Sequence, residues 1–337
     1  TSAVQAGFIT GTLVYALLMI ADRFSPRKVY LASSLLAAAA NAAVLVLPAA
    51  LLSMTTTRFG IGFFLAGIYP VGMKIASGWY RRGLGAALGV LVGALVLGTA
   101  LPHGLRALGS SWAWPTVVLA VSAIAAAGGL LMHAAVPDGP FLGRSARMNP
   151  RALALIWRDP ALRAPAFGYF GHMWELYAFW ALVPLIVASR LSGPALSLAA
   201  FVTIAVGFIG CVGGGVLVRR FGGARVACAQ LATSGLCCLA APWLLDAGPA
   251  VFAAWMLVWG ITVVGDSPQF SALSADAAPR ELVGSVLTII NCIGFALTAI
   301  LIPVFAEAVA SWSLERVLPF LAIGPLAGLA AMRRLLR

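Results

Sequence analysis

Charged residues are scarce in this chain. They make up 9% of its 337 residues, whereas hydrophobic residues make up 62%. A soluble globular domain carries roughly 25% charged residues, so a chain this apolar could not cover a water-exposed surface with polar groups. The composition therefore excludes an ordinary soluble domain and predicts a protein that lies in a membrane.

Acidic residues are rarer than basic ones, with 10 against 22, which gives a formal net charge of +12. A basic chain can indicate nucleic-acid binding when its basic residues gather on one domain. Here they recur between apolar segments, which is how membrane proteins distribute positive charge. We therefore expect no nucleic-acid partner.

Motifs for catalysis and for bound cofactors are also missing from the sequence. There is no Gly-x-x-x-x-Gly-Lys-Ser/Thr phosphate-binding loop. The five cysteines all fall inside apolar segments, and none has metal-ligand spacing with a histidine. Small packing residues in helices explain these cysteines. We predict that the protein is not an enzyme and that it holds neither a cofactor nor a metal ion.

Long apolar segments fill most of the chain. A transmembrane helix needs about 20 apolar residues, and eleven segments come close to that length, at residues 3–21, 29–53, 57–78, 84–107, 112–136, 165–189, 195–218, 226–246, 249–271, 283–306 and 315–332. The longest connection is rich in Arg and Pro and separates five segments from six. We predict an all-α membrane protein with an N-terminal bundle at 1–136, a cytoplasmic linker at 137–164 and a C-terminal bundle at 165–337.

The basic residues test this division. Most of them fall in every second connection or at the C-terminus, and only four lie on the other side, namely Arg58, Arg106, Arg190 and Arg316. Because basic loops stay in the cytoplasm, we expect a cytoplasmic C-terminus in the inner (plasma) membrane of the cell. An odd number of spans then puts the N-terminus outside, which predicts a parent of twelve helices whose first helix precedes this chain.

An internal repeat supports two related halves. Residues 23–24, Arg-Phe, recur at residues 220–221, which is 197 positions later. Residues 67–70, Gly-Ile-Tyr-Pro, correspond to residues 265–268, Gly-Asp-Ser-Pro, at an offset of 198. Near-constant offsets of this kind indicate a duplication. Duplicated helical bundles are a transporter architecture, so we predict two pseudo-repeated halves.

The turn at residues 22–28, Asp-Arg-Phe-Ser-Pro-Arg-Lys, resembles the signature loop of the major facilitator superfamily. Residues 219–225 resemble the degenerate second copy of this loop, with Arg219 where the first copy has Asp22. The resemblance covers the whole chain apart from the first helix. It implies a secondary active transporter that works by alternating access. It also implies a gate on the cytoplasmic side, formed by Asp22, Arg23, Arg27, Lys28, Arg220 and Arg225.

Two residues of the N-terminal half have specific expectations. We expect the Asp22 carboxylate to face the start of the helix at 283–306, near Gly284 and Ser285, because a helix N-terminus attracts an anion. The alternative is a solvated basic turn. Arg58 resembles the helix-4 arginine of proton-linked members of the superfamily, or else it extends to the outer membrane surface.

Three glycines, Gly85, Gly89 and Gly93, are spaced four residues apart on one segment. Small residues one turn apart let two helix backbones approach closely. We predict that these glycines lie at a helix–helix contact inside the N-terminal bundle.

Ionisable side chains inside the apolar segments are the candidate functional residues, because each costs about 2.5–3.5 kcal/mol to insert. Residues 165–189 and 249–271 carry them on single helical faces, and the resemblance places these two helices beside the central cavity. The predicted proton-coupling or substrate-cavity residues are Glu175, His172, Asp266, Trp259, Gln269 and Arg58. The alternatives are that His172 and Glu175 satisfy each other in a packed bundle, or that Asp266 lies near a water-exposed helix end.

Proton coupling follows from the burial of these acids, since burial favours the neutral form of a carboxyl group and so lets it carry a proton. We predict that Glu175 or Asp266 couples transport to protons. The expected partners are a small-molecule substrate, protons and the lipid bilayer, and we expect a monomer. The alternative functions are a non-transporting membrane receptor or assembly factor on the same scaffold, or an inactive fragment that lacks the first helix.

Overall fold

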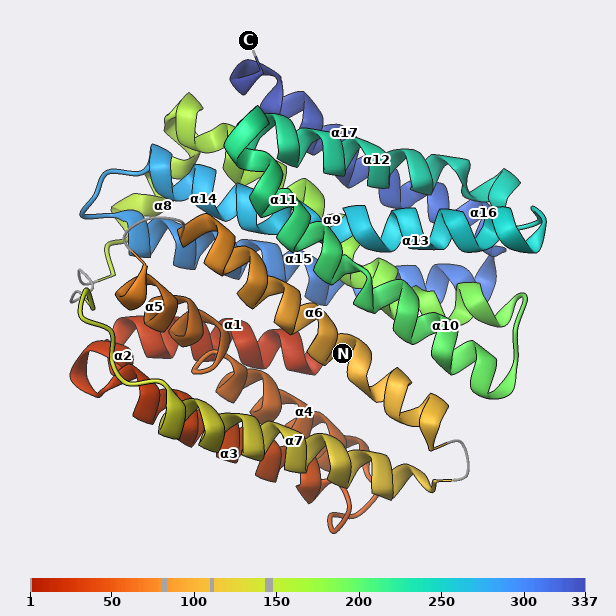
Figure 1. The fold of residues 1–337 in the computed structure, drawn as a ribbon, viewed down its shortest axis with the longest axis horizontal. Helices are drawn as coiled ribbons and strands as arrows, with labels where there is room; N and C mark the ends of the chain where they lie inside the picture. Colours follow the sequence, from red (N-terminus) through yellow and green to blue (C-terminus); the bar gives the residue numbers. More distant parts are fainter. Residues whose placement is uncertain (1, 81–83, 110–111, 143–147, 337) are drawn as a thin grey trace. The chain divides into compact units, whose positions relative to one another are not determined.

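The computed structural model describes residues 2–80, 84–109, 112–142 and 148–336, and across these residues every regular element is a helix (Figure 1). The contacts divide the chain into two compact units. The N-terminal unit consists of Thr1–Ala87 and Ser111–Asn149, and the C-terminal unit consists of Leu88–Ser110 and Pro150–Arg337. The predicted all-helical class is therefore confirmed.

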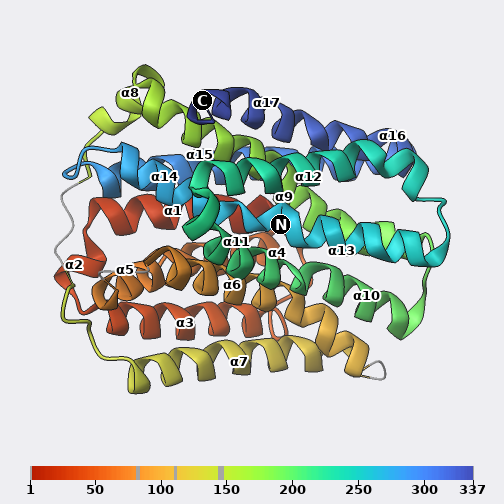
Figure 2. The same cartoon turned by 45° about the horizontal axis from the view of Figure 1, so that its top comes forward.

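The N-terminal unit is built around a close contact between its first helix and its fourth. Its helices are α1 (Ser2–Leu17), α2 (Ile20–Arg23), α3 (Pro26–Ala43), α4 (Leu51–Leu65), α5 (Tyr69–Trp79) and α7 (Trp114–Ala135). Figures 1 and 2 both show α3 and α7 running side by side. Glycines allow α1 and α4 to touch backbone to backbone, because a Cβ atom on Gly62 would overlap the Val4 carbonyl.

The C-terminal unit contains most of α6 (Leu84–Leu108) and every helix from α8 onward. These are α8 (Arg151–Arg158), α9 (Pro160–Ala188), α10 (Gly193–Ala205), α11 (Gly207–Phe221), α12 (Gly223–Leu244), α13 (Pro249–Gly265), α14 (Ser267–Ala277), α15 (Val283–Ser311), α16 (Leu314–Val317), η1 (Leu318–Ala322), α17 (Ile323–Met332) and η2 (Arg333–Leu335). Helix α9 forms the core of this unit, since it is buried along most of its length and packs against α10, α14, α15 and α17.

Local sequence explains where the key helices begin and break. The Asp159 side chain caps α9 by accepting a hydrogen bond from the Ala161 N–H at 2.9 Å. The proline at residue 268 interrupts the helix between α13 and α14, because it has no N–H to donate to the Val264 carbonyl. The Cys211 thiol lies 3.6 Å from this carbonyl and donates to it. A side chain of α11 therefore replaces part of the lost backbone bonding.

Nine helices within the described ranges are long and apolar enough to cross a membrane. They are Leu51–Trp79, Ala86–Leu108, Trp114–Ala135, Pro160–Ala188, Gly193–Phe221, Gly223–Leu244, Pro249–Ala277, Val283–Ser311 and Leu314–Leu335. The first two predicted segments give shorter helices, with 16 residues in α1 and 18 in α3. The segment predicted at 29–53 ends early, at Ala43, and α4 begins only at Leu51, after a turn that contains Pro48.

The predicted glycine contact on α6 exists, but its partner differs from the prediction. A Cβ atom on Gly89 would lie 2.9 Å from the Cys211 carbonyl oxygen, and one on Gly93 would lie 2.7 Å from the Phe208 ring. Both partners belong to α11, so the expectation of a contact inside the N-terminal bundle was wrong. The surroundings of Gly85 lie outside the described part of the chain. The spacing predicted a close approach, but it contained no information on which helix would approach.

Candidate functional site

One face of α9 carries the candidate residues of the C-terminal unit. Gly168, His172, Glu175 and Phe179 follow each other at spacings of 4, 3 and 4. All four contact α13, α14 or the break between them, and the Phe179 ring lies 4.4 Å from the Trp259 ring, centroid to centroid. The absence of a side chain at Gly168 leaves room for Phe270 of α14. A single helical face is thus directed at the broken helix.

The Glu175 carboxylate is enclosed by hydrogen-bond donors and is 1% exposed. Its Oε1 accepts a 2.6 Å hydrogen bond from the Trp259 indole and a 3.2 Å one from the Cys238 thiol. Its Oε2 lies 2.9 Å from the Ser234 hydroxyl. These partners come from α12 and α13, so the alternative that Glu175 and His172 satisfy each other was wrong.

His172 contacts a different acid. Its Nδ1 lies 2.7 Å from Oδ1 of Asp266, and the two side chains are 1% and 0% exposed. Asp266 forms the break between α13 and α14 and is fully buried, which rules out the alternative of a water-exposed helix end. In the described part of the chain, the two ring nitrogens and the two carboxylate oxygens make no hydrogen bond of good geometry. The pair is close but not fully satisfied.

Two glutamines line the other side of this break. The Gln230 amide of α12 donates to the Gly210 carbonyl of α11 at 3.0 Å and presses against Gly265. Gln269 of α14 is 4% exposed, and its amide donates to the Gly265 carbonyl at 3.0 Å. The break is therefore surrounded by polar groups from α9, α11, α12 and α14.

Tryptophans separate Glu175 from solvent. The rings of Trp255 and Trp259 lie 5.2 Å apart, and the Trp255 indole donates to the Cys237 carbonyl at 3.1 Å. Trp259 itself is 0% exposed. The stack fixes the indole that binds Glu175 and keeps water from that side of the carboxylate.

The comparisons with known proteins agree with this architecture. The sequence model of the Major Facilitator Superfamily matches residues 1–303. The chain belongs to the major facilitator superfamily. Its family and its apolar helices together make the chain a multi-pass membrane protein. They also support the function of a secondary transporter.

A solved structure shares the superfamily fold. The chain is similar to a variant of the fucose:proton symporter FucP of E. coli, with 15% sequence identity and a TM-score of 0.66. The match covers 98% of this chain and 90% of that chain. At this identity the likeness establishes the fold alone. No curated protein gives a significant match to the sequence.

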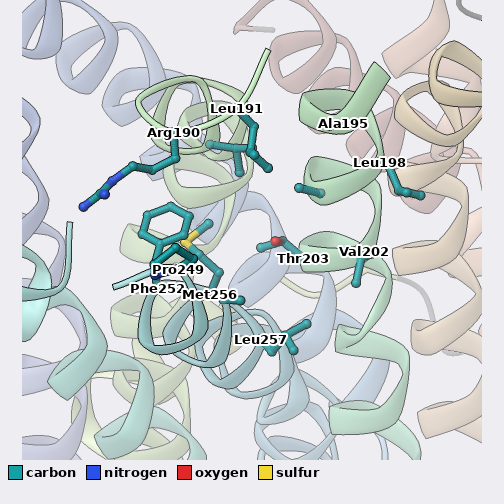
Figure 3. A pocket seen from close by; sticks show the side chains of 13 residues that line it. Arg190, Leu191, Ala195, Leu198, Val202, Thr203, Pro249, Phe252, Met256 and Leu257 are labelled. Atoms are coloured by element: carbon teal, nitrogen blue, oxygen red, sulfur yellow. The ribbon is translucent and has the colours of Figure 1, made fainter. Parts of the chain in front are cut away.

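A cavity of about 600 Å³ lies between the end of α9, α10 and α13 in this superfamily member (Figure 3). Its lining is mostly apolar, and Met256 in the lining lies one helical turn before Trp259. Arg190 stands at the edge, and its side chain points away from Ala195 and Leu198 (Figure 3). Its guanidinium donates to the Leu245 carbonyl instead. The cavity therefore offers an apolar surface rather than a charged one.

The residues predicted for the cytoplasmic gate are spread over both units. In the N-terminal unit Asp22 lies in α2, and its Oδ1 is 2.5 Å from the Lys74 Nζ of α5, which also donates to the Ala21 carbonyl at 3.0 Å. Arg23 and Lys28 are exposed, and Arg27 is partly buried. The pairing of Asp22 with Lys74 was not predicted. The expected approach of Asp22 to the start of α15 stays a prediction.

The remaining candidate residues lie at exposed positions. Arg220 and Arg225 flank the turn between α11 and α12, and the Arg220 guanidinium lies 5.3 Å from the centre of the Phe221 ring. Arg58 of α4 is also exposed. The geometry thus gathers Glu175, His172, Asp266, Trp259 and Gln269 in the C-terminal unit, whereas Arg58 belongs to the N-terminal unit, and its place in the site stays a prediction.

Sequence analysis missed Ser234, Cys238 and Gln230, all on α12. The first two are four residues apart, so they share a helical face, and a polar face on an apolar span was a usable signal. The interpretation of the cysteines as packing residues is incomplete for one of them. The thiol of Cys238 also donates a hydrogen bond to Glu175.

Proposed function

We propose that the protein is a secondary active transporter that moves a small solute across the plasma membrane by alternating access, coupled to protons. The observation that carries the proposal is the Glu175 carboxylate. It is 1% exposed in a membrane-spanning helix, and it accepts hydrogen bonds from three neutral donors, on Ser234, Cys238 and Trp259. A buried ionisable residue in such a helix is costly to keep for packing alone.

Glu175 is the first candidate for the coupling group and Asp266 is the second. Burial favours the neutral form of a carboxyl group, so a buried acid can bind the coupled proton and release it when the transporter changes state. His172 and Asp266 lie close by, and their imidazole and carboxyl groups could take part in the same transfer. The solved neighbour of the same fold is a fucose:proton symporter, which is consistent with proton coupling.

Alternating access requires two bundles and a gate. We propose that the chain corresponds to eleven helices of a twelve-helix parent, with bundles at 1–136 and 165–337 joined by a linker. The repeat offsets of 197 and 198 residues support two pseudo-repeated halves. Asp22 belongs to the proposed cytoplasmic gate, together with Arg23, Arg27, Lys28, Arg220 and Arg225. We further propose a monomer with a cytoplasmic C-terminus.

The experiment is a transport assay in proteoliposomes with the full-length protein. A panel of labelled sugars and organic acids is first screened for uptake driven by a pH gradient. Glu175→Gln keeps the shape of the side chain but cannot bind a proton. We expect this variant to lose uphill accumulation, by at least tenfold, and to keep downhill exchange.

The matched control is Glu307→Gln, which removes an exposed acid on α15 and should leave accumulation unchanged. If Glu175→Gln still concentrates the solute under a pH gradient, Glu175 is not the coupling group. Asp266→Asn would then be tested in the same way.

A further inference from the structure

The two oxygens of the Glu175 carboxylate have different surroundings. Both neighbours of Oε1 are donors: the Trp259 indole has no acceptor, and the Cys238 thiol accepts only weakly. A hydrogen atom on Oε1 would point at these donors and break their bonds. A proton on Glu175 must therefore sit on Oε2.

Oε2 faces the Ser234 hydroxyl, which has two places for its single hydrogen. The Ser234 Oγ lies 2.9 Å from Oε2 of Glu175 and 3.1 Å from the Leu231 carbonyl oxygen on its own helix. A hydroxyl group can donate one hydrogen bond and can accept others. Ser234 can thus either donate to Glu175 or accept from it.

We propose that Ser234 is a positioning residue for proton exchange at Glu175. When Glu175 is ionised, the Ser234 hydroxyl donates to Oε2. When a proton binds Oε2, the new O–H donates to the Ser234 Oγ, and the serine hydrogen turns to the Leu231 carbonyl. One proton joins or leaves Oε2, and no other covalent bond forms or breaks.

This arrangement lets a dry site hold both states of the acid. A buried donor or acceptor without a partner costs about 1–3 kcal/mol, and here each state satisfies every group around the carboxylate. The inference rests on the proposed function only for the use of the proton in transport. Proton exchange at Glu175 can be measured without any substrate.

Other titratable groups surround the site and must be considered in any pH experiment. His172 lies one turn earlier on α9, and Cys238 contacts Glu175 from α12, where Cys237 precedes it. Asp266, between α13 and α14, lies 2.7 Å from this histidine. Each of these groups is unchanged in the variants below, so differences between variants report on Ser234.

The test is an infrared pH titration of the full-length protein in lipid, following the C=O stretch of a protonated carboxyl group. The Glu175 band is identified by its absence from Glu175→Gln. In Ser234→Ala the ionised form loses a charge-assisted hydrogen bond, which is roughly twice as strong as the neutral bond that the protonated form loses. We expect the titration midpoint of this band to move up by about one pH unit, a tenfold gain in proton affinity.

Two variants make this result specific. Ser234→Thr keeps the hydroxyl and should restore the wild-type midpoint. Thr298→Val is the matched control, because Thr298 is equally buried and its hydroxyl donates to the Phe295 carbonyl at 2.8 Å in the same way. If Ser234→Ala does not fold, Ser234→Cys replaces it and should move the midpoint in the same direction.

The proposal is overturned if the Glu175 band is present in Ser234→Ala or Ser234→Cys but its midpoint differs from the wild-type midpoint by less than about 0.2 pH units. The expected tenfold effect is a shift of about one unit. The absence of any titrating Glu175 band would overturn it as well. If the midpoint shifts as expected in Ser234→Ala but transport does not depend on the pH gradient, this inference stands and the proposed function is refuted.

Discussion

Two of the interrupted helices among the described residues, α4–α5 and α13–α14, have similar breaks in different surroundings. In each, a glycine precedes a proline by three residues, at residues 67–70 and 265–268. Both prolines lack the N–H that would continue the helix. At Gly67 the Ser33 hydroxyl occupies the space of a side chain, and at Gly265 the Gln230 amide does so.

The partner residues correspond as well as the breaks do. Ser33 and Gln230 are 197 positions apart, and the two glycines are 198 positions apart. The residue after the glycine differs, because Ile68 stands in the first break where Asp266 stands in the second. A break of this kind therefore forms without an ionisable group. Asp266 is not needed to interrupt the helix, which favours a role in proton transfer for it and its partner His172.

The largest effect should come from removing His172. His172→Gln leaves a buried acid without its partner, and breaking a buried pair costs about 3–5 kcal/mol. Thermal unfolding in detergent at pH 8 measures the loss. The double variant with Asp266→Asn should recover most of the stability, and equal losses in the single and double variants would contradict the pairing.

The glycine contacts should respond alike in the two units. A Cβ atom would overlap the Val4 carbonyl at Gly62 and the Ile261 carbonyl at Gly210. Overpacking of this kind costs about 1–3 kcal/mol, so Gly62→Ala and Gly210→Ala should each lower the melting temperature.

Neighbouring glycines provide the controls for this prediction. Gly60 has only the Ala40 Cβ near it, at 3.8 Å, and Gly213 has no atom within 4 Å among the described residues. Gly60→Ala and Gly213→Ala should stabilise slightly, since alanine favours helix by about 1 kcal/mol over glycine. If only one of Gly62→Ala and Gly210→Ala lowers the melting temperature, the contacts in the two units are not equivalent.

Periodicity and motif spacing could predict a good part of this structure. The spacing of His172 and Glu175 placed them on one face of α9. The repeat of residues 67–70 at 265–268 predicted related halves but not the helix breaks that lie there. The loop at residues 22–28 indicated the superfamily. These features depend on neighbours in sequence, so one sequence is enough to find them.

Contacts between distant helices could not be predicted in the same way. Ser234 lies 59 residues from Glu175, and Lys74 lies 52 residues from Asp22. Which side chains meet depends on the rotation and the depth of each packed helix, and many registers satisfy the same apolar pattern. For this reason His172 was paired with Glu175 in one interpretation, whereas its partner is Asp266.

The smallest effect should come from the ion pair of the N-terminal unit. The side chains of Lys74 and Asp22 are 15% and 10% exposed, in contrast to the fully enclosed pair at the second break. After Asp22→Asn, Lys74 keeps its bond to the Ala21 carbonyl and some contact with water. We expect the free energy of unfolding to fall by about 1 kcal/mol, the upper end for a solvent-accessible ion pair. The fall should be smaller at high salt, because salt screens the attraction.

The measurement is the melting temperature in detergent at low and high salt, with Asp246→Asn as the control. Asp246 is 88% exposed and lies 3.5 Å from Arg190, so its removal should change little. A loss of about 1 kcal/mol corresponds to a fall in melting temperature of roughly 4 °C for a unit of this size. If Asp22→Asn instead cost as much as His172→Gln at both salt concentrations, water would not reach the Asp22–Lys74 pair. The electrostatic difference between the two breaks would then be lost.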